Sequence, residues 1–420
     1  MLIMFRAKNY RCFHDEVVLD MRASGLREHQ THFTTIDDMK VLKTLALYGA
    51  NASGKTTIIK AMHQFEDFVL QNMFFEGKSE EEFVFDESLS ENLSPFALTK
   101  AAPENTEMEM VFYTGGSYYQ YGFEVEHSTK NIKSEWLLVN DEEIFEIIND
   151  EIHPGVKYRE ELKHLPRKRK DRLYLSVLDY FADGILGNFV KEIKNYFTQE
   201  LFFDWIRYAD IGFKQFGSLT EAQPRFVDDK EFRKRVIDCV HSIDVGIVDI
   251  KVETRTHRSP RTGEERKRYT LKTIHNTYDA EGNFTGTKPF SIHDESMGTI
   301  KFLMMIQVLL NIIEKGGTFV IDELSQSYHP MITRFIVDLF QSEENKNGAQ
   351  LIFTTHDTSL LNNSQFRRDE VAFIEKNNRG ESRLYTLADL KVRSDASFAK
   401  DYFNGRYGAI PIISSEGGMP

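Results

Sequence analysis

Eight consecutive residues have the types and spacing needed to hold a phosphate group: Gly49-Ala50-Asn51-Ala52-Ser53-Gly54-Lys55-Thr56. They match the loop pattern G-x-x-x-x-G-K-[ST], whose glycines let backbone N–H groups approach phosphates closely. Lys55 is predicted to reach the β- and γ-phosphates of a nucleotide, and the Thr56 hydroxyl to ligate Mg²⁺. A strand-like run precedes the loop, and Ile58, Met62, Phe65 and Val69 follow at helical spacing. We therefore predict a nucleotide site at the start of a helix.

Two adjacent acids, Asp322 and Glu323, follow the apolar run 319–321. Paired carboxylates are costly to bury without a cation, so the pair favours a metal site. In phosphate-loop enzymes the first acid lies near Mg²⁺, and the second orients and deprotonates the attacking water. We predict Asp322 as a metal ligand and Glu323 as a general base.

Two further segments carry suitable groups. The apolar run 351–353 leads to His356, whose imidazole could hydrogen-bond the γ-phosphate or the attacking water. Ser296, Gly298 and Thr299 precede an apolar helix predicted over 302–313. A hydroxyl, backbone N–H groups and a helix dipole together predict a second anion site there.

The remaining sequence indicates which elements position these groups. Residues 1–20 predict two strands, and 20–40 are polar and irregular. Alternating, aromatic-rich runs beside Gly115-Gly116 predict a hairpin in a mostly β segment that could include one or two more strands. Mixed three- and four-residue apolar steps predict helices over 157–245. Strands then flank a basic tip, which we expect to be a mobile hairpin.

After residue 290, strand-like runs at 317–323, 350–356 and 370–376 alternate with helix-like segments. This alternation is typical of a largely parallel sheet. The last stretch, 404–420, is predicted to be an extended tail. The fold class that we predict is α/β.

Composition limits the function classes. The chain has 420 residues, of which 41% are hydrophobic and 28% are charged, as in ordinary globular proteins. No apolar run reaches the ~18 residues of a membrane span, and the opening residues lack the apolar core of a signal peptide. Two cysteines, Cys12 and Cys239, are too few for a disulfide framework. We expect two reduced thiols in a cytoplasmic protein.

The net charge of -13 opposes a protein coated uniformly with nucleic acid. The charges are nevertheless clustered along the sequence, in one acidic run, 77–92, and two basic runs, 157–172 and 255–269. The clustered cations are Arg167, Lys168, Arg169 and Lys170 in the first basic run, and Arg258, Arg261, Arg266, Lys267 and Arg268 in the second. They predict contact with an anionic partner, either nucleic acid or an acidic protein face. We favour a protein because of the overall charge.

The order of these motifs resembles that of the ABC-type ATPases, and within them the SMC/RecF/OLD-like branch. Details resemble single-domain ATPases of that branch that are often encoded in bacterial anti-phage islands. The matching segments are Phe5 to Phe13, Glu295 to Thr299, Ile321 to Leu324, His329-Pro330 and Gly405 to Pro411. The resemblance implies an ATPase head with a mostly parallel sheet, an antiparallel β subdomain and a helical insertion lobe.

By position, the resemblance assigns the residues from Gly49 through Thr57 to the Walker A loop. It assigns Asp322-Glu323 to Walker B. Ser296, Gly298 and Thr299 stand in the signature motif, Ser325 to Ser327 in the D-loop, and His356 is the switch histidine. Met297 and Tyr328 depart from the commoner residues but remove no catalytic group. A glutamine that senses Mg²⁺ is expected in the middle lobe, and Gln120 is one of several candidates.

The resemblance also implies cofactors, partners and domain boundaries. ATP and Mg²⁺ would bind in a head-to-tail homodimer. Each ATP would meet Lys55, Thr56, Asp322, Glu323 and His356 of one subunit, and Ser296 and Gly298 of the other. The predicted segments are 1–70, the first half of the head; 71–155, a β-rich insertion; 156–245, a helical lobe; 246–290, a β-hairpin region; 291–390, the second half of the head; and 391–420, a tail.

Three functions remain open. The first is a sensor or gate in anti-phage defence that acts with a separately encoded effector, such as a nuclease. The second is a RecF- or SMC-like ATPase that binds DNA, and the third is a phosphate-loop kinase or GTPase. The residues between Thr57 and Ser296 are not heptad-rich and contain no Cys-x-x-Cys hook, which opposes a long SMC coiled coil. No Asn/Thr-Lys-x-Asp motif supports a GTPase, and too few residues follow His356 for a fused nuclease.

Overall fold

The computed structural model describes residues 1–73, 93–99, 105–166, 170–203, 224–243, 246–258 and 265–411. The acidic run 77–92 lies outside them. The chain divides into two compact units. The first comprises Met1–Phe203, Lys315–Gln326 and Thr333–Pro420, and the second comprises Asp204–Glu314 and Ser327–Ile332.

A six-stranded sheet carries the phosphate-loop strand of the first unit. In spatial order its strands are β11 (Leu201–Phe203), β15 (Thr318–Ile321), β16 (Gln350–Thr354), β5 (Thr44–Tyr48), β17 (Val371–Lys376) and β18 (Ser382–Thr386). All neighbours run parallel except β17 and β18. The side chains of β5, β15 and β16 are buried throughout, as expected for parallel strands covered on both faces. The predicted α/β class and largely parallel sheet are confirmed.

Strand β11 corrects the prediction of helices throughout 157–245. Helices α3 (Arg159–Lys163), α4 (Tyr174–Phe181) and α5 (Gly184–Asn195) do form, and a π-helical turn, Tyr196–Glu200, follows. The next three residues then pair in parallel with Thr318–Val320. Three apolar residues are too few to show a period of two, so only the free edge of β15 makes them a strand.

A seven-stranded antiparallel sheet forms the other β layer of this unit. In spatial order its strands are β10 (Glu151–Pro154), β9 (Glu142–Ile148), β8 (Ile132–Val139), β7 (Ser117–Val125), β6 (Thr106–Thr114), β1 (Leu2–Lys8) and β2 (Val17–Asp20). The predicted hairpin is confirmed, because Gly115 and Gly116, at φ +56° and +80°, join β6 to β7. Both have left-handed backbones, as the tight two-residue turn requires.

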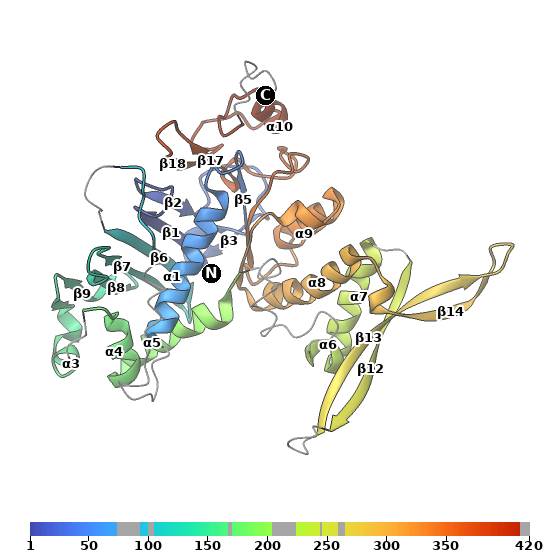
Figure 1. Ribbon diagram of the computed structural model, residues 1–420, viewed down its shortest axis with the longest axis horizontal. Coiled ribbons are helices and arrows are strands. Elements are labelled where there is room, and N and C mark those ends of the chain that lie inside the picture. The colour runs from blue at the N-terminus through green and yellow to red at the C-terminus, as the bar shows by residue number, and fades with distance from the viewer. Residues whose placement is uncertain are drawn as a thin grey trace. The chain divides into compact units, whose positions relative to one another are not determined.

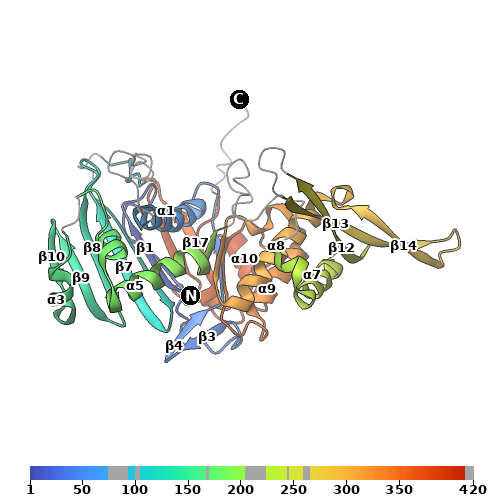
Figure 2. The same ribbon diagram turned by 90° about the horizontal axis from the view of Figure 1, so that it is seen from below.

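Helix α1 (Lys55–Met73) packs against the antiparallel sheet (Figure 1). Its Phe65 stacks on Phe123 of β7, with ring centroids 5.2 Å apart, and meets Phe5 of β1 edge-on at 6.0 Å. Helix α5 lies along the same sheet (Figure 2), where Phe189 contacts Tyr119 of β7. This aromatic core holds α1, and therefore the predicted phosphate-binding loop at its start, in one place.

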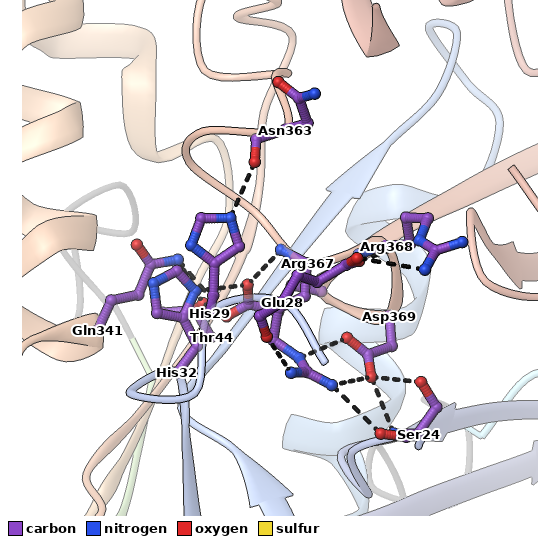
Figure 3. Close-up of polar contacts among 11 residues, drawn as sticks. Ser24, Glu28, His29, His32, Thr44, Gln341, Asn363, Arg367, Arg368 and Asp369 are labelled. Carbon is purple, nitrogen blue, oxygen red and sulfur yellow. Dashed lines mark hydrogen bonds and ion pairs between the residues drawn. The ribbon is translucent and has the colours of Figure 1, made fainter. Parts of the chain in front are cut away.

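The sequence predicts an irregular stretch over 20–40, but part of this stretch is regular in the structure. Strands β3 (Phe33–Ile36) and β4 (Met39–Leu42) form a hairpin whose turn includes Asp37 at φ +51°. Four-residue strands are too short to give a clear alternation. Tertiary contacts anchor the preceding loop: Arg367, with a fully buried side chain, donates to Asp369 and to the carbonyls of Ser24 and Glu28 (Figure 3).

The C-terminal residues pack on β17 and β18, so the predicted extended tail is wrong for 404–411. Helix α10 (Phe398–Phe403) precedes turns in which Tyr407 and Ala409 are buried. The Tyr385 hydroxyl donates to the Tyr407 carbonyl at 2.6 Å, and the Tyr402 ring stacks on Phe373 of β17. Residues 412–420 lie outside the described part of the chain.

The second unit combines helices with a three-stranded antiparallel sheet (Figures 1 and 2). Its elements are α6 (Pro224–Asp228), α7 (Lys230–Ile243), β12 (Ile247–Arg258), β13 (Glu265–Tyr278), β14 (Phe284–Ser291) and most of α8 (Met297–Lys315). The two strands predicted beside the basic tip are β12 and β13, and the tip, 259–264, is outside the described residues. Ion pairs from Arg225 and Arg235 to Glu314 join α6 and α7 to α8.

By length and composition, α8 passes as a membrane span, and it is the one such helix among the described residues. Two thirds of its apolar window are buried inside the protein, as in the core helix of a globular unit. Helix α9 spans Pro330–Gln341, of which the first three residues belong to the second unit and the rest to the first.

Candidate nucleotide site

The loop 49–54 joins β5 to α1 in a conformation that needs both of its motif glycines. Gly49 has φ +154°, and a Cβ there would lie 2.4 Å from the Ile374 carbonyl oxygen. Gly54 has φ +119°, and a Cβ there would lie 2.9 Å from Cys12 Sγ. Ala52 also has a left-handed backbone, at φ +61°. Neighbouring strands therefore enclose the loop so tightly that side chains are excluded at both glycines.

Lys55 begins α1 and folds back over the loop. Its ammonium group donates to the carbonyl oxygens of Gly49, at 2.8 Å, and Ala50, at 3.0 Å. Burial lowers the pKa of Lys55, and the nearby carboxylates of Glu323 and Asp322 oppose that shift. The cation thus lies inside the loop with two acids close by.

The structure brings Thr56 and Asp322 together, although they are far apart in the sequence. The Thr56 hydroxyl donates to Asp322 Oδ2 at 2.9 Å, and the Thr354 hydroxyl donates to Asp322 Oδ1 at 2.6 Å. Strand β16, which ends at Thr354, lies between β5 and β15 and places its last residue beside both. Thr354 was not predicted as a site residue. The one sequence signal that could have indicated it is a polar residue at the end of a buried strand.

Glu323 has an unusual backbone for a residue with a side chain. Its φ is +52°, and its N–H donates to the Thr354 hydroxyl at 2.6 Å. Left-handed residues other than glycine are uncommon, and they cluster at functional sites. The Glu323 carboxylate lies 4.0 Å from His356 Nε2, and both side chains are partly exposed.

Several charges act on His356. Burial lowers its pKa, Lys55 lowers it further, and Glu323 and Asp322 partly oppose both effects. The imidazole is therefore neutral near pH 7, which leaves one ring nitrogen as an acceptor and the other as a donor.

Hydrogen bonds anchor the segments on either side of His356. The Ser325 and Thr355 hydroxyls lie 2.7 Å apart, and Thr355 Oγ1 accepts from the Asp357 N–H at 2.9 Å. The buried Tyr48, which directly precedes Gly49, donates its hydroxyl to the Asp357 carbonyl at 3.2 Å. The predicted D-loop therefore contacts the histidine strand through Ser325, while of Ser327 the structure describes the backbone alone.

The residues present fit a magnesium nucleotide. A hydroxyl and a carboxylate 2.9 Å apart are oxygen ligands of the kind that Mg²⁺ prefers. Ser53 Oγ is buried and has no hydrogen-bond partner among the described residues, in a loop whose two motif glycines are closely packed. A lysine ammonium and the N-terminus of a 19-residue helix add positive charge at the same place.

The predicted signature turn forms the N-terminus of α8 in the second unit. Ser296 caps this helix, since its Oγ accepts from the Thr299 N–H at 3.1 Å and lies 2.9 Å from the Thr299 hydroxyl. Among the described residues, a Cβ on Gly298 would come within 4 Å of Ser296 Oγ alone, at 3.7 Å, and Met297 beside it is exposed. Unlike Gly49 and Gly54, Gly298 is therefore not crowded by the described part of its own chain.

Other predicted residues are engaged elsewhere or lie beyond description. The Gln120 amide, in the middle of β7, donates to Glu109 at 2.9 Å. Lys170 forms an exposed ion pair with Asp150. Arg167, Lys168, Arg169 and Arg261 lie outside the described residues, and of Arg258, Arg266, Lys267 and Arg268 the structure describes the backbone alone.

One group that the sequence did not indicate lies further along α1. The ligand atoms of His63, Glu66 and Asp67 lie within 4.8 Å of one another on one helix face. Burial lowers the pKa of His63 to about 4 and raises the pKa of Asp67 to about 6. Burial also raises the pKa of Glu66 well above its ordinary value, so the surroundings disfavour the charged form of all three groups.

No curated protein matches significantly. Similar solved structures include an SMC head domain from Thermotoga maritima, with 12% identity over 92% of this chain and 98% of that one and a TM-score of 0.40. An SMC head bound to the C-terminal winged-helix domain of ScpA has 13% identity over 92% and 97% and a TM-score of 0.44. An SMC head with an extended coiled coil, bound to the C-terminal domain of ScpA from Pyrococcus furiosus, has 13% identity over 96% and 98% and a TM-score of 0.40.

A family model matches most of the chain, over residues 45–362, and this span contains every motif of the candidate site. The chain therefore belongs to the family described as AAA domain, putative AbiEii toxin, Type IV TA system, and it is an AAA-domain ATPase by family.

Proposed function

We propose that this chain binds Mg²⁺-ATP in the loop 49–57 and hydrolyses it to ADP and phosphate. The observation that carries the proposal is the meeting of Lys55, Thr56, Asp322, Glu323 and His356 at the ends of β5, β15 and β16. Three separate sequence motifs supply these groups. A purely structural polar cluster would not need an enclosed glycine loop, a lysine inside it and a left-handed glutamate together.

In this proposal each residue has a distinct role. The loop N–H groups and Lys55 hold the phosphates, while Thr56 and Asp322 ligate Mg²⁺. Glu323 accepts a proton from the attacking water. Neutral His356, 4.0 Å away, positions that water or the γ-phosphate by hydrogen bonding. Thr354 orients both acids through its single hydroxyl.

The proposed active state is a head-to-tail homodimer in which Ser296, Gly298 and Thr299 of one subunit close over ATP held by the other. The surroundings of Gly298 support this arrangement, because the described part of its own chain does not crowd this residue and so leaves room for another molecule. The N-terminus of α8 offers N–H groups to an anion.

The cellular role that we propose is a sensor or gate in anti-phage defence that acts with a separately encoded effector. The family description, which names a toxin of a toxin–antitoxin system, supports it. The alternative is a RecF- or SMC-like ATPase that binds DNA, and the two basic runs, 157–172 and 255–269, are its main support. Duplex DNA binding would weaken with salt by about 0.9 in log–log slope per phosphate contacted.

The proposed activity is tested with Glu323→Gln. The amide orients water but accepts no proton, so we expect ATP binding to persist and turnover to fall by about 100- to 10,000-fold. Glu344→Gln, at an exposed position, serves as the control for a changed charge. Near-normal turnover in Glu323→Gln would refute the assignment of the base.

The dimer is tested separately by sedimentation in the Glu323→Gln background, which preserves bound ATP. Gly298→Asp places a carboxylate where we propose that the γ-phosphate approaches. We expect this variant to bind ATP and to lose the ATP-dependent dimer. Unchanged assembly would contradict the head-to-tail arrangement while leaving the hydrolytic site standing.

A further inference from the structure

Glu295, the residue directly before Ser296, is held by strand β13. Its Oε1 accepts from the Thr273 hydroxyl and from His275 Nε2, the latter at 2.8 Å. Thr273 is fully buried, and the Glu295 carboxylate is 11% exposed. Residues two apart on a strand share one face, so both donors reach the same carboxylate from the sheet.

A second connection runs through the backbone. Strand β14 ends at Ser291, and a 3₁₀ turn, Ile292–Asp294, leads directly to Glu295. A capping box closes the N-terminal end of this turn, because Asp294 accepts from the Ser291 N–H while Ser291 Oγ accepts from the His293 N–H. Since β14 pairs with β13, the sheet contacts the signature turn both along the chain and through side chains.

The packing of His275 fixes the direction of its bond to Glu295. Its ring meets Phe290 of β14 edge-on, with centroids 5.1 Å apart, and Lys288 lies directly opposite His275 in the ladder. By contrast, Tyr278 and Phe284 at the far end of these strands are more than half exposed. The part of the sheet that is well packed is therefore the part that touches Glu295.

We propose that Thr273 and His275 are positioning residues that couple the β12–β13–β14 sheet to the signature turn through Glu295. The inference rests on the proposed role of Ser296 and Gly298 in closing over a partner's ATP. A shift of the sheet moves the Glu295 carboxylate, and with it the first turn of α8. The sheet is then the input through which a molecule bound to it changes ATP-dependent assembly.

The variant His275→Ala removes one donor, and His275→Gln restores it, since the glutamine amide can donate from nearly the same position. A hydrogen bond to a charged group is typically worth enough to change an equilibrium about 10- to 100-fold. In the Glu323→Gln background we expect His275→Ala to weaken ATP-dependent dimerisation by about that factor while ATP affinity is unchanged. His275→Gln should recover most of the loss.

The neighbouring Lys272 offers a matched control on the opposite face of the same strand. It forms an ion pair with Glu253 at 2.8 Å and does not touch the signature turn in any described contact. Lys272→Ala perturbs the sheet without touching Glu295, so it should dimerise like the parent. An equal loss in Lys272→Ala and His275→Ala would overturn the proposed coupling.

Hydrogen exchange supplies a readout that does not depend on the dimer. Without nucleotide, His275→Ala should raise exchange at the amides of 296–300, whereas Lys272→Ala should not. Unchanged exchange there would refute the coupling. If the amides respond but no variant, including the parent, dimerises with ATP, the coupling stands and the head-to-tail proposal fails.

Discussion

The buried pair Arg367–Asp369 allows a stability prediction whose size follows from the structure. Their side chains are 0% and 6% exposed, and two guanidinium nitrogens donate to the carboxylate, each at 2.9 Å. Arg367 also donates to the carbonyls of Glu28 and Ser24, so it ties the loop 24–28 to the residues before β17. Arg367→Met keeps the apolar stem but leaves a buried charge and two carbonyls without their donor (Figure 3).

Removing one partner of a buried ion pair typically costs about 3 to 5 kcal/mol, because the remaining charge has lost its compensation. Asp369 keeps two hydrogen bonds from Ser24, at 2.8 and 2.6 Å. We therefore expect Arg367→Met to lower the free energy of unfolding by about 3 kcal/mol, the lower end of that range. Replacing both residues, as Arg367→Met with Asp369→Leu, removes the uncompensated charge. The double variant should therefore be more stable than the sum of the single changes predicts, by about 1 to 3 kcal/mol.

Urea unfolding followed by tryptophan fluorescence measures these differences. A Trp205→Phe background leaves Trp136, in β8 of the same unit, as the reporter. The control is Arg393→Met, which breaks an ion pair of the same spacing with Asp395 in which both partners are exposed, and which should cost ~1 kcal/mol or less. The reasoning would be refuted if Arg367→Met lowered the free energy of unfolding by less than ~1 kcal/mol. It would also be refuted if the effect of the double variant equalled the sum of the two single effects.

Two further predictions concern the nucleotide site. Gly54→Ala should abolish ATP binding in calorimetry. Adding Cys12→Ala should not restore binding, because a φ of +119° remains strained for any residue with a side chain. The control Gly298→Ala should still bind ATP. The pKa of His356 lies below its ordinary value, so the protonated form that would stop turnover accumulates only as the pH falls through that lowered pKa. Activity should therefore hold between pH 8 and about 6.5, the ordinary histidine value, and a histidine-dependent loss within that range would contradict the assignment.

Much of the candidate site is determined by local sequence. The glycine pattern around Lys55 predicts a loop between a strand and a helix, because only glycine permits those backbone angles and such close approach. The hairpin at Gly115-Gly116 follows from the same local rule. Buried strands such as 350–354 reveal themselves by continuous apolar residues, which need no knowledge of their neighbours.

Tertiary structure decides the rest. Thr354 reaches Asp322 only because β16 lies between β5 and β15, and no spacing along the chain encodes that order of strands. The bond between His275 and Glu295 likewise depends on how β13 meets the start of α8. Strand β11 exists because β15 offers it an edge. Local sequence sets the conformations that a segment can adopt, whereas the partner of a hydrogen-bonding edge or a buried charge comes from a distant segment, which only the packed chain supplies.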